Sequence, residues 1–473
     1  MNELSEWLDR HHVDIIRTHA TSLDGPGVGK YLQRNKFFSS LPNGPSVSDI
    51  ALYMDVTGTP HMTAWHHQRE ANFGDINLRP DISTLISDGT DKRLGHCICD
   101  FTTSDGEPME LCPRSTLKEM VSLVKDQGYS VKAAFELEFF VFKESFEEAK
   151  RKHYRDLTPI STAGAAGGTA GIYSLRNAYL LTPFMNEVIK RLEWKGIKWE
   201  AWNDEAATSQ VELNLPPTDP ISAADNVVRT KQILFEVAHD MGMSVTFMPK
   251  PLPGYSSGMH IHHSLQHCSS QQHALIKGEA GGAAFYDASE AQNRTPLMLN
   301  WIAGILKTMP GAVSYLCPSA NSFRRFKQYS AVPMTKNWGE DNKSTALRVI
   351  SKSKNLARIE HRVGASDTNP YLALSVILAG GLAGIKHNLS PPTEYKNLAW
   401  GLKPSENDLP LSLSLAAKCL KNDDYLKEIM GSSRVEYWAK TREAEWLAFH
   451  TEGADALSER ISEWEFLRYF DIT

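Results

Sequence analysis

The sequence has little of what marks a secreted or disulfide-stabilised protein. Only six of its 473 residues are cysteine, and no two of them form a CxxC pair. Cys97 and Cys99 would point the same way on a strand, which is poor geometry for a disulfide. The N-terminal segment carries charges throughout and has no apolar stretch of the signal-peptide kind. We therefore expect free thiols in a reducing cytoplasm.

The chain also lacks a membrane-spanning segment and an excess of basic residues. Its longest apolar run, 372–385, is too short to cross a bilayer and contains Gly380 and Gly381. Because the run follows Asn369 and Pro370, which favour a helix start, it predicts a buried core helix. The net charge is −6, which is not the charge balance of a nucleic-acid-binding protein. We expect neither nucleic acid nor membrane among its partners.

Two common nucleotide-binding motifs are missing as well. No Walker A sequence occurs, and no GxGxxG opens a predicted helix. The composition is that of a globular protein, with 41% hydrophobic and 22% charged residues, and the length suggests two domains. Short extended segments and turns fill the chain to about residue 108. A helical pattern over 116–127 and an apolar strand over 131–142 follow, so the boundary is expected near residue 110.

Two glutamates lie inside the predicted strand 131–142, VKAAFELEFFVF. Glu136 and Glu138 are two residues apart, so they point to the same face of a strand. Neighbouring carboxylates on a buried strand repel each other and need either a cation between them or a raised pKa. The alternative is a solvated strand face, which the flanking phenylalanines disfavour.

Other polar residues repeat this spacing. Glu212 alternates with apolar residues in QVELN, and Glu205 stands in the loop before that segment. His260 and His262 follow Gly258, which allows close approach of the backbone. Each of these features taken alone also has an ordinary structural explanation, such as a solvated strand face or a hydrogen-bonded histidine.

Arg358, Glu360 and Arg362 would form one row on a strand. The row is either a structural ion-pair ladder or a metal ligand flanked by two anion binders. The whole candidate ligand set is five carboxylates and one imidazole: Glu136, Glu138, Glu205, Glu212, His260 and Glu360. Such ligands suit Mg²⁺ or Mn²⁺ rather than a cysteine-bound zinc. Together with nearby arginines they predict phosphoryl-transfer chemistry.

In this combination the motifs resemble the glutamine synthetase family over nearly the whole chain. The matching segments, in order, are LDGPGVGKYL, ELEFF, NDEAATSQVELN, TFMPKPLPGYSSGMHIHHSL, PSANSFRRF, WGEDNKSTALR and RIEHRVGASDTNPYLALS. The resemblance implies an α+β fold, with a small N-terminal β-grasp domain (1–108) and a large catalytic domain (109–473). It also implies a cytoplasmic homo-oligomer of two stacked hexameric rings, with active sites between subunits.

The resemblance further implies ATP and roughly two or three divalent ions, Mg²⁺ or Mn²⁺, at each site. One ion would be held by Glu138, Glu205 and Glu212. The ion beside the transferring phosphate would be held by Glu136, His260 and Glu360.

The resemblance also assigns the substrate contacts. The residues it implies for the acid substrate are Arg325, Arg362, Ser256 and Gly258. Those implied for the nucleotide are His262, Ser264, Arg348 and Arg358. Those implied for catalysis are Arg325, Arg348 and Lys343.

The sequence departs from ammonium-using members of the family in the flap that follows Arg325. Those enzymes carry a flap glutamate that holds ammonium and accepts its proton, whereas the segment 326–333, FKQYSAVP, has no carboxylate and contains Lys327. Tyr255 and Ser256 replace the usual Asn-Gly of the amino-acid loop, and Lys343 replaces an arginine. No adenylylation tyrosine falls within 397–400. The flap argues against ammonium as the nitrogen donor.

We therefore expect an ATP-dependent ligase that joins the γ-carboxylate of glutamate to an organic amine through γ-glutamyl phosphate. Polyamines, alkylamines and arylamines all suit this chemistry. The missing flap carboxylate, Trp65-His66-His67 and Trp338 favour a neutral or apolar amine. Two alternatives stay open: an ammonium-dependent glutamine synthetase, and a non-catalytic ring-forming member, against which the intact ligand set speaks.

Overall fold

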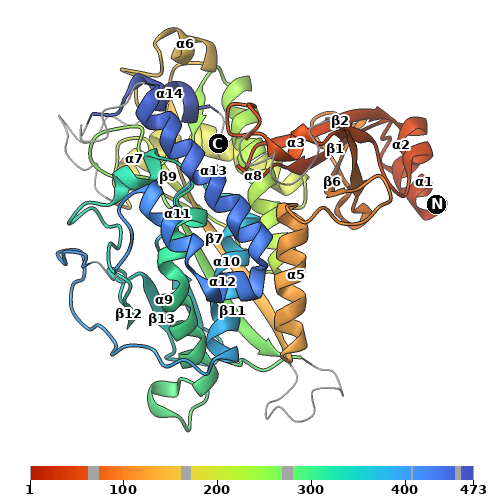
Figure 1. Ribbon diagram of the computed structural model, residues 1–473. Helices are drawn as coiled ribbons and strands as arrows, with labels where there is room; N and C mark the ends of the chain where they lie inside the picture. The colour runs from red at the N-terminus through yellow and green to blue at the C-terminus, as the bar shows by residue number, and fades with distance from the viewer. Residues whose placement is uncertain are drawn as a thin grey trace.

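The protein combines two β-sheets with helices packed on them. A computed structural model describes residues 2–61, 74–160, 172–268, 281–405, 408–452 and 460–471. In Figure 1 the N-terminal sheet, coloured red and orange, projects from one side of a larger body that holds the second sheet. The expected α+β class is confirmed.

The N-terminal sheet is six-stranded, with the order β2-β1-β6-β4-β3 and β5 paired with β6. Only the β1–β6 pairing is parallel among these described strands. The strands are β1 (Ile15–Thr21), β2 (Gly27–Gln33), β3 (Ser46–Ser48), β4 (Asp75–Pro80), β5 (Ile86–Ser87) and β6 (Leu94–Thr102). The helices are α1 (Asn2–Arg10), α2 (Arg34–Ser40) and α3 (Ile50–Tyr53). The sequence description of this part as strands and turns missed the helices.

The N-terminal sheet has a small core of its own. Leu8 of α1 and Phe37 of α2 pack with Ile16 of β1 and Cys97 of β6. Cys97 and Cys99 both lie in β6, and all the cysteines are free thiols, as expected.

The larger sheet is eight-stranded, with the order β12-β13-β14-β11-β7-β9-β8 and β10 paired with β7. The predicted strand 131–142 is the long strand β7 (Tyr129–Phe142), which lies between β9 and β11. Its neighbours are β8 (Ala201–Asp204), β9 (Gln210–Asn214), β10 (Ser244–Thr246), β11 (Met259–His267), β12 (Trp338–Glu340), β13 (Leu347–Ile350) and β14 (Arg358–His361).

One face of the larger sheet is covered by helices. Val131, Ala133, Phe135 and Leu137 of β7 point into the main hydrophobic core. The helices are α5 (Pro113–Asp126), α6 (Phe146–Arg151), α7 (Leu175–Trp194), α8 (Pro220–Asp240), α9 (Pro296–Leu316), α10 (Pro370–Lys386), α11 (Leu413–Lys421), α12 (Asp424–Met430), α13 (Ser432–Thr451) and α14 (Glu463–Tyr469). Because side chains alternate along a strand, the other face of β7 presents Glu136 and Glu138.

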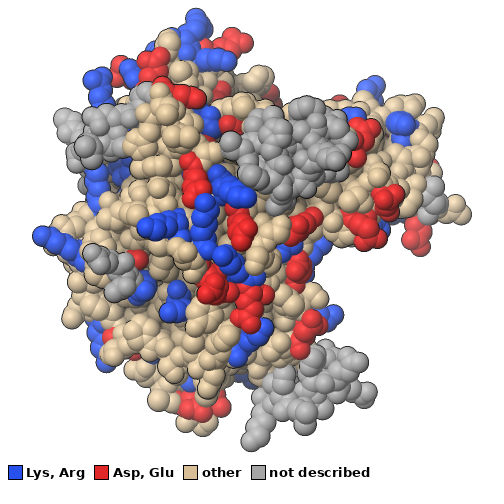
Figure 2. All heavy atoms as spheres, in the orientation of Figure 1, with Lys and Arg blue, Asp and Glu red and all other residues tan. Residues whose placement is uncertain are grey.

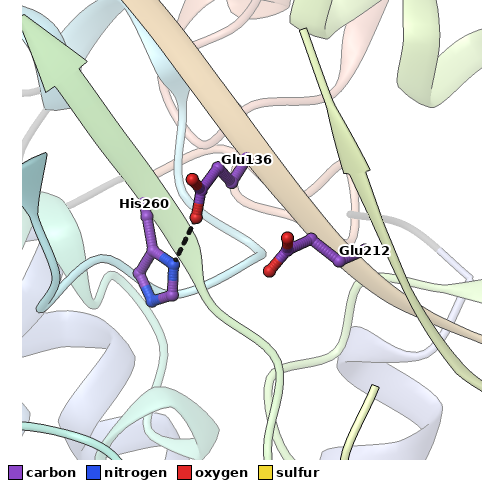
Figure 3. Close-up of side chains that lie close together, drawn as sticks. All are labelled: Glu136, Glu212 and His260. Carbon is purple, nitrogen blue, oxygen red and sulfur yellow. Dashed lines mark hydrogen bonds and ion pairs between the residues drawn. The ribbon is translucent and has the colours of Figure 1, made fainter. Parts of the chain in front are cut away.

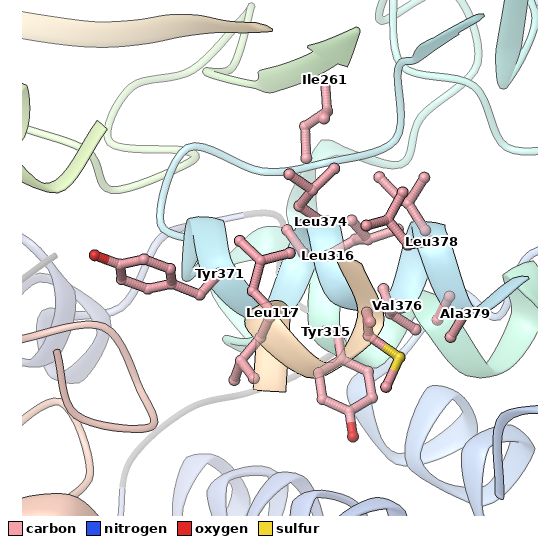
Figure 4. Packing of buried hydrophobic residues seen from close by; sticks show 14 of the residues in the cluster. Leu117, Ile261, Tyr315, Leu316, Tyr371, Leu374, Val376, Leu378 and Ala379 are labelled. Atoms are coloured by element: carbon pink, nitrogen blue, oxygen red, sulfur yellow. The ribbon is translucent and has the colours of Figure 1, made fainter. Parts of the chain in front are cut away.

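The predicted core helix is α10, which is buried along nearly its whole length. The Asn369 side chain caps it by accepting hydrogen bonds from the amides of Tyr371 and Leu372, and Pro370 occupies the first position. Glycines let α9 and α10 touch, since a Cβ on Gly304 would lie 2.1 Å from the carbonyl oxygen of Gly380. Figure 4 shows Leu374 and Leu378 of α10 packed in this core.

The surface agrees with the small net charge. On the face shown in Figure 2, lysine and arginine side chains are interspersed with aspartate and glutamate rather than gathered by sign. Within the described ranges, no helix is both long and apolar enough to span a bilayer.

Candidate active site

The pairing of β7 with its neighbours places the predicted ligands side by side. Glu136 is opposite His260 of β11, and Glu138 is opposite Glu212 of β9. These three strands are held by the apolar residues that alternate with the ligands and point into the core. Figure 3 shows Glu136, Glu212 and His260 converging from the three strands.

Two histidines bind the Glu136 carboxylate. His260 Nδ1 lies 3.0 Å from Glu136 Oε2, and His262 Nε2 lies 2.8 Å from Glu136 Oε1. The ligand atoms of Glu136, Glu212 and His260 all lie within 4.8 Å of one another, and so do those of Glu136, His262 and Glu360. This grouping by distance cuts across the two predicted sets and adds His262 as a candidate ligand. The assignment of each residue to each ion stays a prediction.

Glu138 and Glu205 are oriented by amide groups. Glu138 accepts hydrogen bonds from the Gly258 amide at 2.9 Å and from the Gln210 side chain at 3.0 Å. Glu205 follows β8, and its carboxylate accepts a hydrogen bond from the Ala206 amide at 2.9 Å. Sequence reasoning gave Gln210 no role, although its alternation with Glu212 marked it as lying on the same strand face.

The carboxylates of the site repel one another strongly. Burial, with the charge of Glu138, raises the pKa of Glu205 to about 7. Burial, with the charges of Glu136 and Glu138, raises the pKa of Glu212 to about 8. Burial also acts to raise the pKa of Glu136, but hydrogen bonds from His260 and His262 outweigh it and hold that pKa well below its usual range. Oxygen ligands whose negative charge is this unfavourable fit a divalent cation of the Mg²⁺ or Mn²⁺ type.

Arginines surround Glu360 at the other end of the cluster. Glu360 is fully buried and pairs with Arg348 at 2.9 Å and with Arg362. Burial acts to raise the pKa of Glu360, yet the charge of Arg362 outweighs it and lowers this pKa to about 2. Arg348 also contacts Asp341 at 2.7 Å. Of the row expected from the sequence, Arg362 pairs with Glu360, whereas Arg358 donates to His262 and to the Leu356 carbonyl, and Arg348 of β13 is the second arginine on Glu360.

Arg325 is buried beside the amino-acid loop. Its guanidinium donates to the carbonyl oxygens of Val363 at 3.0 Å and Gly364 at 2.9 Å. A Cβ on Gly258 would lie 3.2 Å from Arg325 Nη2 and 3.4 Å from Glu138 Oε1, so a side chain there would crowd both groups. Ser256 is half-buried, and its carbonyl oxygen accepts a hydrogen bond from the Gln210 side-chain amide at 3.2 Å.

Two cavities bear on the predicted substrate contacts. One, of about 760 Å³, is lined by none of the predicted nucleotide residues, and the other, of about 610 Å³, is lined by several of them. The second is lined by the predicted nucleotide residues His262, Ser264 and Arg358 and reaches Glu136. Arg358 donates to His262 Nδ1 at 3.3 Å, which fixes the two side chains against each other. Arg348 is not among the lining residues, and Lys343 is exposed in the turn between β12 and β13. Asn355 and Leu356 also line the cavity, and no sequence pattern pointed to them.

The flap segment 326–333 packs against a neighbouring loop. The Tyr329 amide donates to the Trp400 carbonyl at 3.0 Å, and the Gln328 side chain donates to that of Gly401 at 2.9 Å. The larger cavity lies beside it and is lined in part by Phe326, Lys327 and Lys250. Burial, with the charges of Lys327 and Arg325, lowers the pKa of Lys250 to about 8.

Of the aromatic and histidine residues that favour an apolar amine in the sequence, only Trp338 lies in the described part of the chain. Trp338 is buried in β12 and donates its indole N–H to the Pro392 carbonyl at 2.8 Å, so it has a structural role. Trp65, His66 and His67 lie outside the described residues.

Comparison with known proteins decides the family. Residues 110–469 match the model for "Glutamine synthetase, catalytic domain". The chain belongs to the glutamine synthetase family. The family uses ATP and divalent metal ions, and its ligases join glutamate to an amine and form oligomers. The resemblance carried by the sequence motifs is thus confirmed, and the carboxylate-rich ligand set agrees with it.

The most similar relatives of this glutamine synthetase family member include amine ligases. Glutamate–isopropylamine ligase of a Pseudomonas species is 28% identical and covers 99% of this chain and 98% of its own. Gamma-glutamylanilide synthase of an Acinetobacter species is 30% identical and covers 84% and 79%. A solved structure described as "Apo GmaS without ligand" has a TM-score of 0.81 over 98% of both chains at 22% identity, which supports the fold.

Proposed function

We propose that this enzyme joins the γ-carboxylate of glutamate to an organic amine, with ATP converted to ADP and phosphate. The γ-carboxylate attacks the γ-phosphorus of ATP, ADP leaves, and γ-glutamyl phosphate forms. The amine nitrogen then attacks the acyl carbon, phosphate leaves, and the nitrogen loses a proton. Activation as an acyl phosphate makes an otherwise unfavourable amide bond accessible.

The residues of the site suit these steps. Divalent ions, when bound, would offset charge on the phosphates and template the in-line displacement. Glu136, His260 and Glu360 would hold one ion, and Glu138, Glu205 and Glu212 the other. His262, which also contacts Glu136, would stand where the nucleotide cavity meets the ions.

The arginines would bind the carboxylates and phosphates of the substrates. Arg325 and Arg362 would orient the glutamate carboxylates, as the family resemblance implies. Arg348, Arg358 and Lys343 would offset negative charge on the phosphates as it develops. Ser256 and Gly258 would form the loop against which the amino acid lies.

The flap is the observation on which the choice of amine rests. Segment 326–333 packs on Trp400 and Gly401 and presents no carboxylate. An ammonium ion, or a protonated alkylamine, needs a negative group to hold it and a base to deprotonate it. Lys327 would instead repel a cation. A neutral amine needs no negative group to hold it and no deprotonation before it attacks, so it depends less on such help.

The cavity beside the flap supports a neutral, apolar amine. Its walls include the aromatic side chains of Phe323, Phe326, Trp446 and Phe449. The cations Lys250 and Lys327 also line it, together with three arginines and one carboxylate, that of Asp156, so positive charge predominates. Aromatic walls favour an arylamine through burial and ring contacts, whereas the cations disfavour an alkylammonium ion. Of the two amine ligases among the relatives, gamma-glutamylanilide synthase agrees with an arylamine, whereas glutamate–isopropylamine ligase is named for an alkylamine.

The proposal extends to the domain boundaries, the assembly and the cellular location of the enzyme. The N-terminal β-grasp domain would span 1–108 and the catalytic domain 109–473. The assembly would be two stacked hexameric rings with active sites between subunits, working in the cytoplasm.

Turnover against an amine panel tests the proposal. ADP release would be measured with glutamate and each of aniline, isopropylamine, putrescine and ammonium, and hydroxylamine would trap the acyl phosphate as a hydroxamate. We expect kcat/KM to be highest for aniline. Turnover with ammonium alone would support the ammonium-dependent alternative, and failure to form hydroxamate would support the non-catalytic one.

A further inference from the structure

The cavity beside the flap combines aromatic walls with an excess of positive charge. Its volume of about 760 Å³ is within the usual range for a small-molecule site. The cationic side chains that line it are Lys250, Lys327, Arg155, Arg324 and Arg460, and Asp156 is the lining carboxylate. An uncharged aromatic ligand would use the walls of this cavity and leave its cations unmatched.

Two of the arginines have carboxylate partners that belong to α14. Arg324 Nη2 lies 2.8 Å from Glu465 Oε2, and Arg155 Nη2 lies 3.8 Å from Glu463 Oε2. The lining carboxylate, Asp156, is exposed. These pairs offset positive charge beside α14, but none of the three carboxylates is among the charges that shift the pKa of the buried lysine of the cavity.

That buried lysine, Lys250, has only carbonyl oxygens as partners. Its side chain donates to the carbonyls of Gly254 and Tyr255, and the residue is 8% exposed. Among the residues that the structure describes, no carboxylate lies within ion-pair distance of it. The charges that act on it are those of two cations, Lys327 and Arg325, which together with burial lower its pKa to about 8. Because a desolvated cation without a counter-charge is costly, an anionic group beside Lys250 would offset that cost.

Lys250 lies where the cavity meets the amino-acid loop. The two carbonyls that it holds come directly before Ser256, and the Ser257 amide donates to the Pro249 carbonyl at 2.8 Å. The next residue is Gly258, whose amide binds Glu138 at 2.9 Å. A ligand in contact with Lys250 would therefore lie next to the loop that belongs to the candidate active site.

We propose that the amine substrate is an aminobenzoate, an arylamine whose ring carries a carboxylate, and that Lys250 and Lys327 bind this carboxylate. The inference rests on the proposed amine-ligase function and narrows its substrate class. The carboxyl group is ionised at pH 7, because ordinary carboxyl groups titrate near pH ~4. Ammonium groups bind it as compact charges, while the aromatic walls contact the ring. The ring nitrogen is neutral, so this substrate also needs no flap carboxylate.

A second source of negative charge for Lys250 is the substrate glutamate itself. In that case Lys250 would act on glutamate with every amine, and a carboxylate on the ring would give no advantage. The two possibilities differ in one measurable quantity, the ratio of kcat/KM for an aminobenzoate to that for the aminobenzamide with the same substitution pattern. The amide has nearly the same shape and no charge.

Kinetics with matched amines test the inference. Rates would be measured at saturating glutamate and ATP with aniline, the three aminobenzoate isomers and the three aminobenzamides. We expect at least one aminobenzoate to exceed both its amide and aniline in kcat/KM by about tenfold or more. Equal kcat/KM for acid and amide in every isomer would overturn the inference.

Lysine variants locate the carboxylate. Lys250→Met and Lys327→Gln should each lower the acid-to-amide ratio severalfold, and Lys250→Arg, which keeps the charge, should retain most of it. Lys152→Met is the matched control, because Lys152 pairs with Glu144 at 2.6 Å and does not line the cavity. A ratio that is the same in Lys250→Met, Lys327→Gln and Lys152→Met would overturn the inference, even if Lys250→Met raised the KM for glutamate.

Binding of benzoate separates this inference from the proposed function, because benzoate has no nitrogen to react. Calorimetry on the full chain would compare sodium benzoate with benzamide at constant ionic strength. We expect benzoate to bind more tightly, with affinity weakened about tenfold by Lys250→Met. Turnover of aniline without preference for benzoate over benzamide would overturn this inference and leave the proposed function standing. Tight binding of benzoate without turnover of any amine would support the carboxylate site and overturn the proposed function.

Discussion

Replacing Glu212 by glutamine should stabilise the metal-free protein while it weakens metal binding. Glu212 is buried next to Glu136 and Glu138, which raises its pKa from 4.5 to about 8. Keeping this carboxyl ionised in the metal-free fold would cost about 5 kcal/mol if all of the shift belonged to it. Because three carboxylates share the repulsion, we expect a net gain of about 2 kcal/mol for Glu212→Gln at pH 8.

The sign of the pH dependence follows from the direction of the shift. A carboxyl whose folded pKa is raised makes the folded state lose stability as the pH rises from 4.5 to about 8. Glu212→Gln and the native protein should therefore be equally stable near pH 4.5, and the variant should become the more stable one as the pH increases.

Urea unfolding with a chelator or with Mg²⁺ measures both effects. The variant should unfold at higher urea than the native protein at pH 8 without metal, and it should gain less from Mg²⁺. Glu6→Gln, at an exposed position in α1, is the matched control and should behave like the native protein. Equal unfolding midpoints without metal at pH 8, together with equal stabilisation by Mg²⁺, would refute the reasoning.

Three further predictions concern metal, core and flap. Because Glu205 and Glu212 have pKa values of about 7 and about 8, Mg²⁺ affinity should rise by more than about a hundredfold from pH 6 to pH 8, and calorimetry in two buffers should detect proton release. Gly304→Ala should cost about 2 kcal/mol or more in urea unfolding, because its Cβ would meet α10, whereas Gly27→Ala, which meets nothing within 4 Å, should be near neutral. Lys327→Glu should raise the ratio of kcat/KM for ammonium to that for aniline by about tenfold, and Lys336→Glu, outside the flap, should leave this ratio unchanged. An unchanged ratio in Lys327→Glu would remove the electrostatic basis for excluding ammonium.

Elements with a strong local pattern could be predicted from the sequence. The alternation in VKAAFELEFFVF predicted β7 and placed Glu136 and Glu138 on one face. Asn369 and Pro370, followed by an apolar run, predicted α10. The helix α1 was missed because its apolar residues are few and its charges dominate the pattern. The first depends on local alternation and the second on a helix-start signal before an apolar run, and neither needs knowledge of tertiary contacts.

The arrangement of the site depends on contacts between distant segments. That Glu136 binds both His260 and His262 follows from the register of β7 with β11, which local patterns do not specify. The pairing of Arg348 with Glu360 likewise depends on the register of β13 with β14. Residue spacing supplied the candidate metal ligands and the family resemblance the substrate contacts, whereas only the fold shows which of them touch.

A competition experiment tests the central claim most directly. Equal concentrations of aniline and ammonium would be given to the enzyme with glutamate, ATP and Mg²⁺, and the two products would be quantified by mass spectrometry. We expect γ-glutamylanilide to exceed glutamine at pH 7, because the flap offers no carboxylate to ammonium. Glutamine as the main product would contradict the proposed choice of an organic amine.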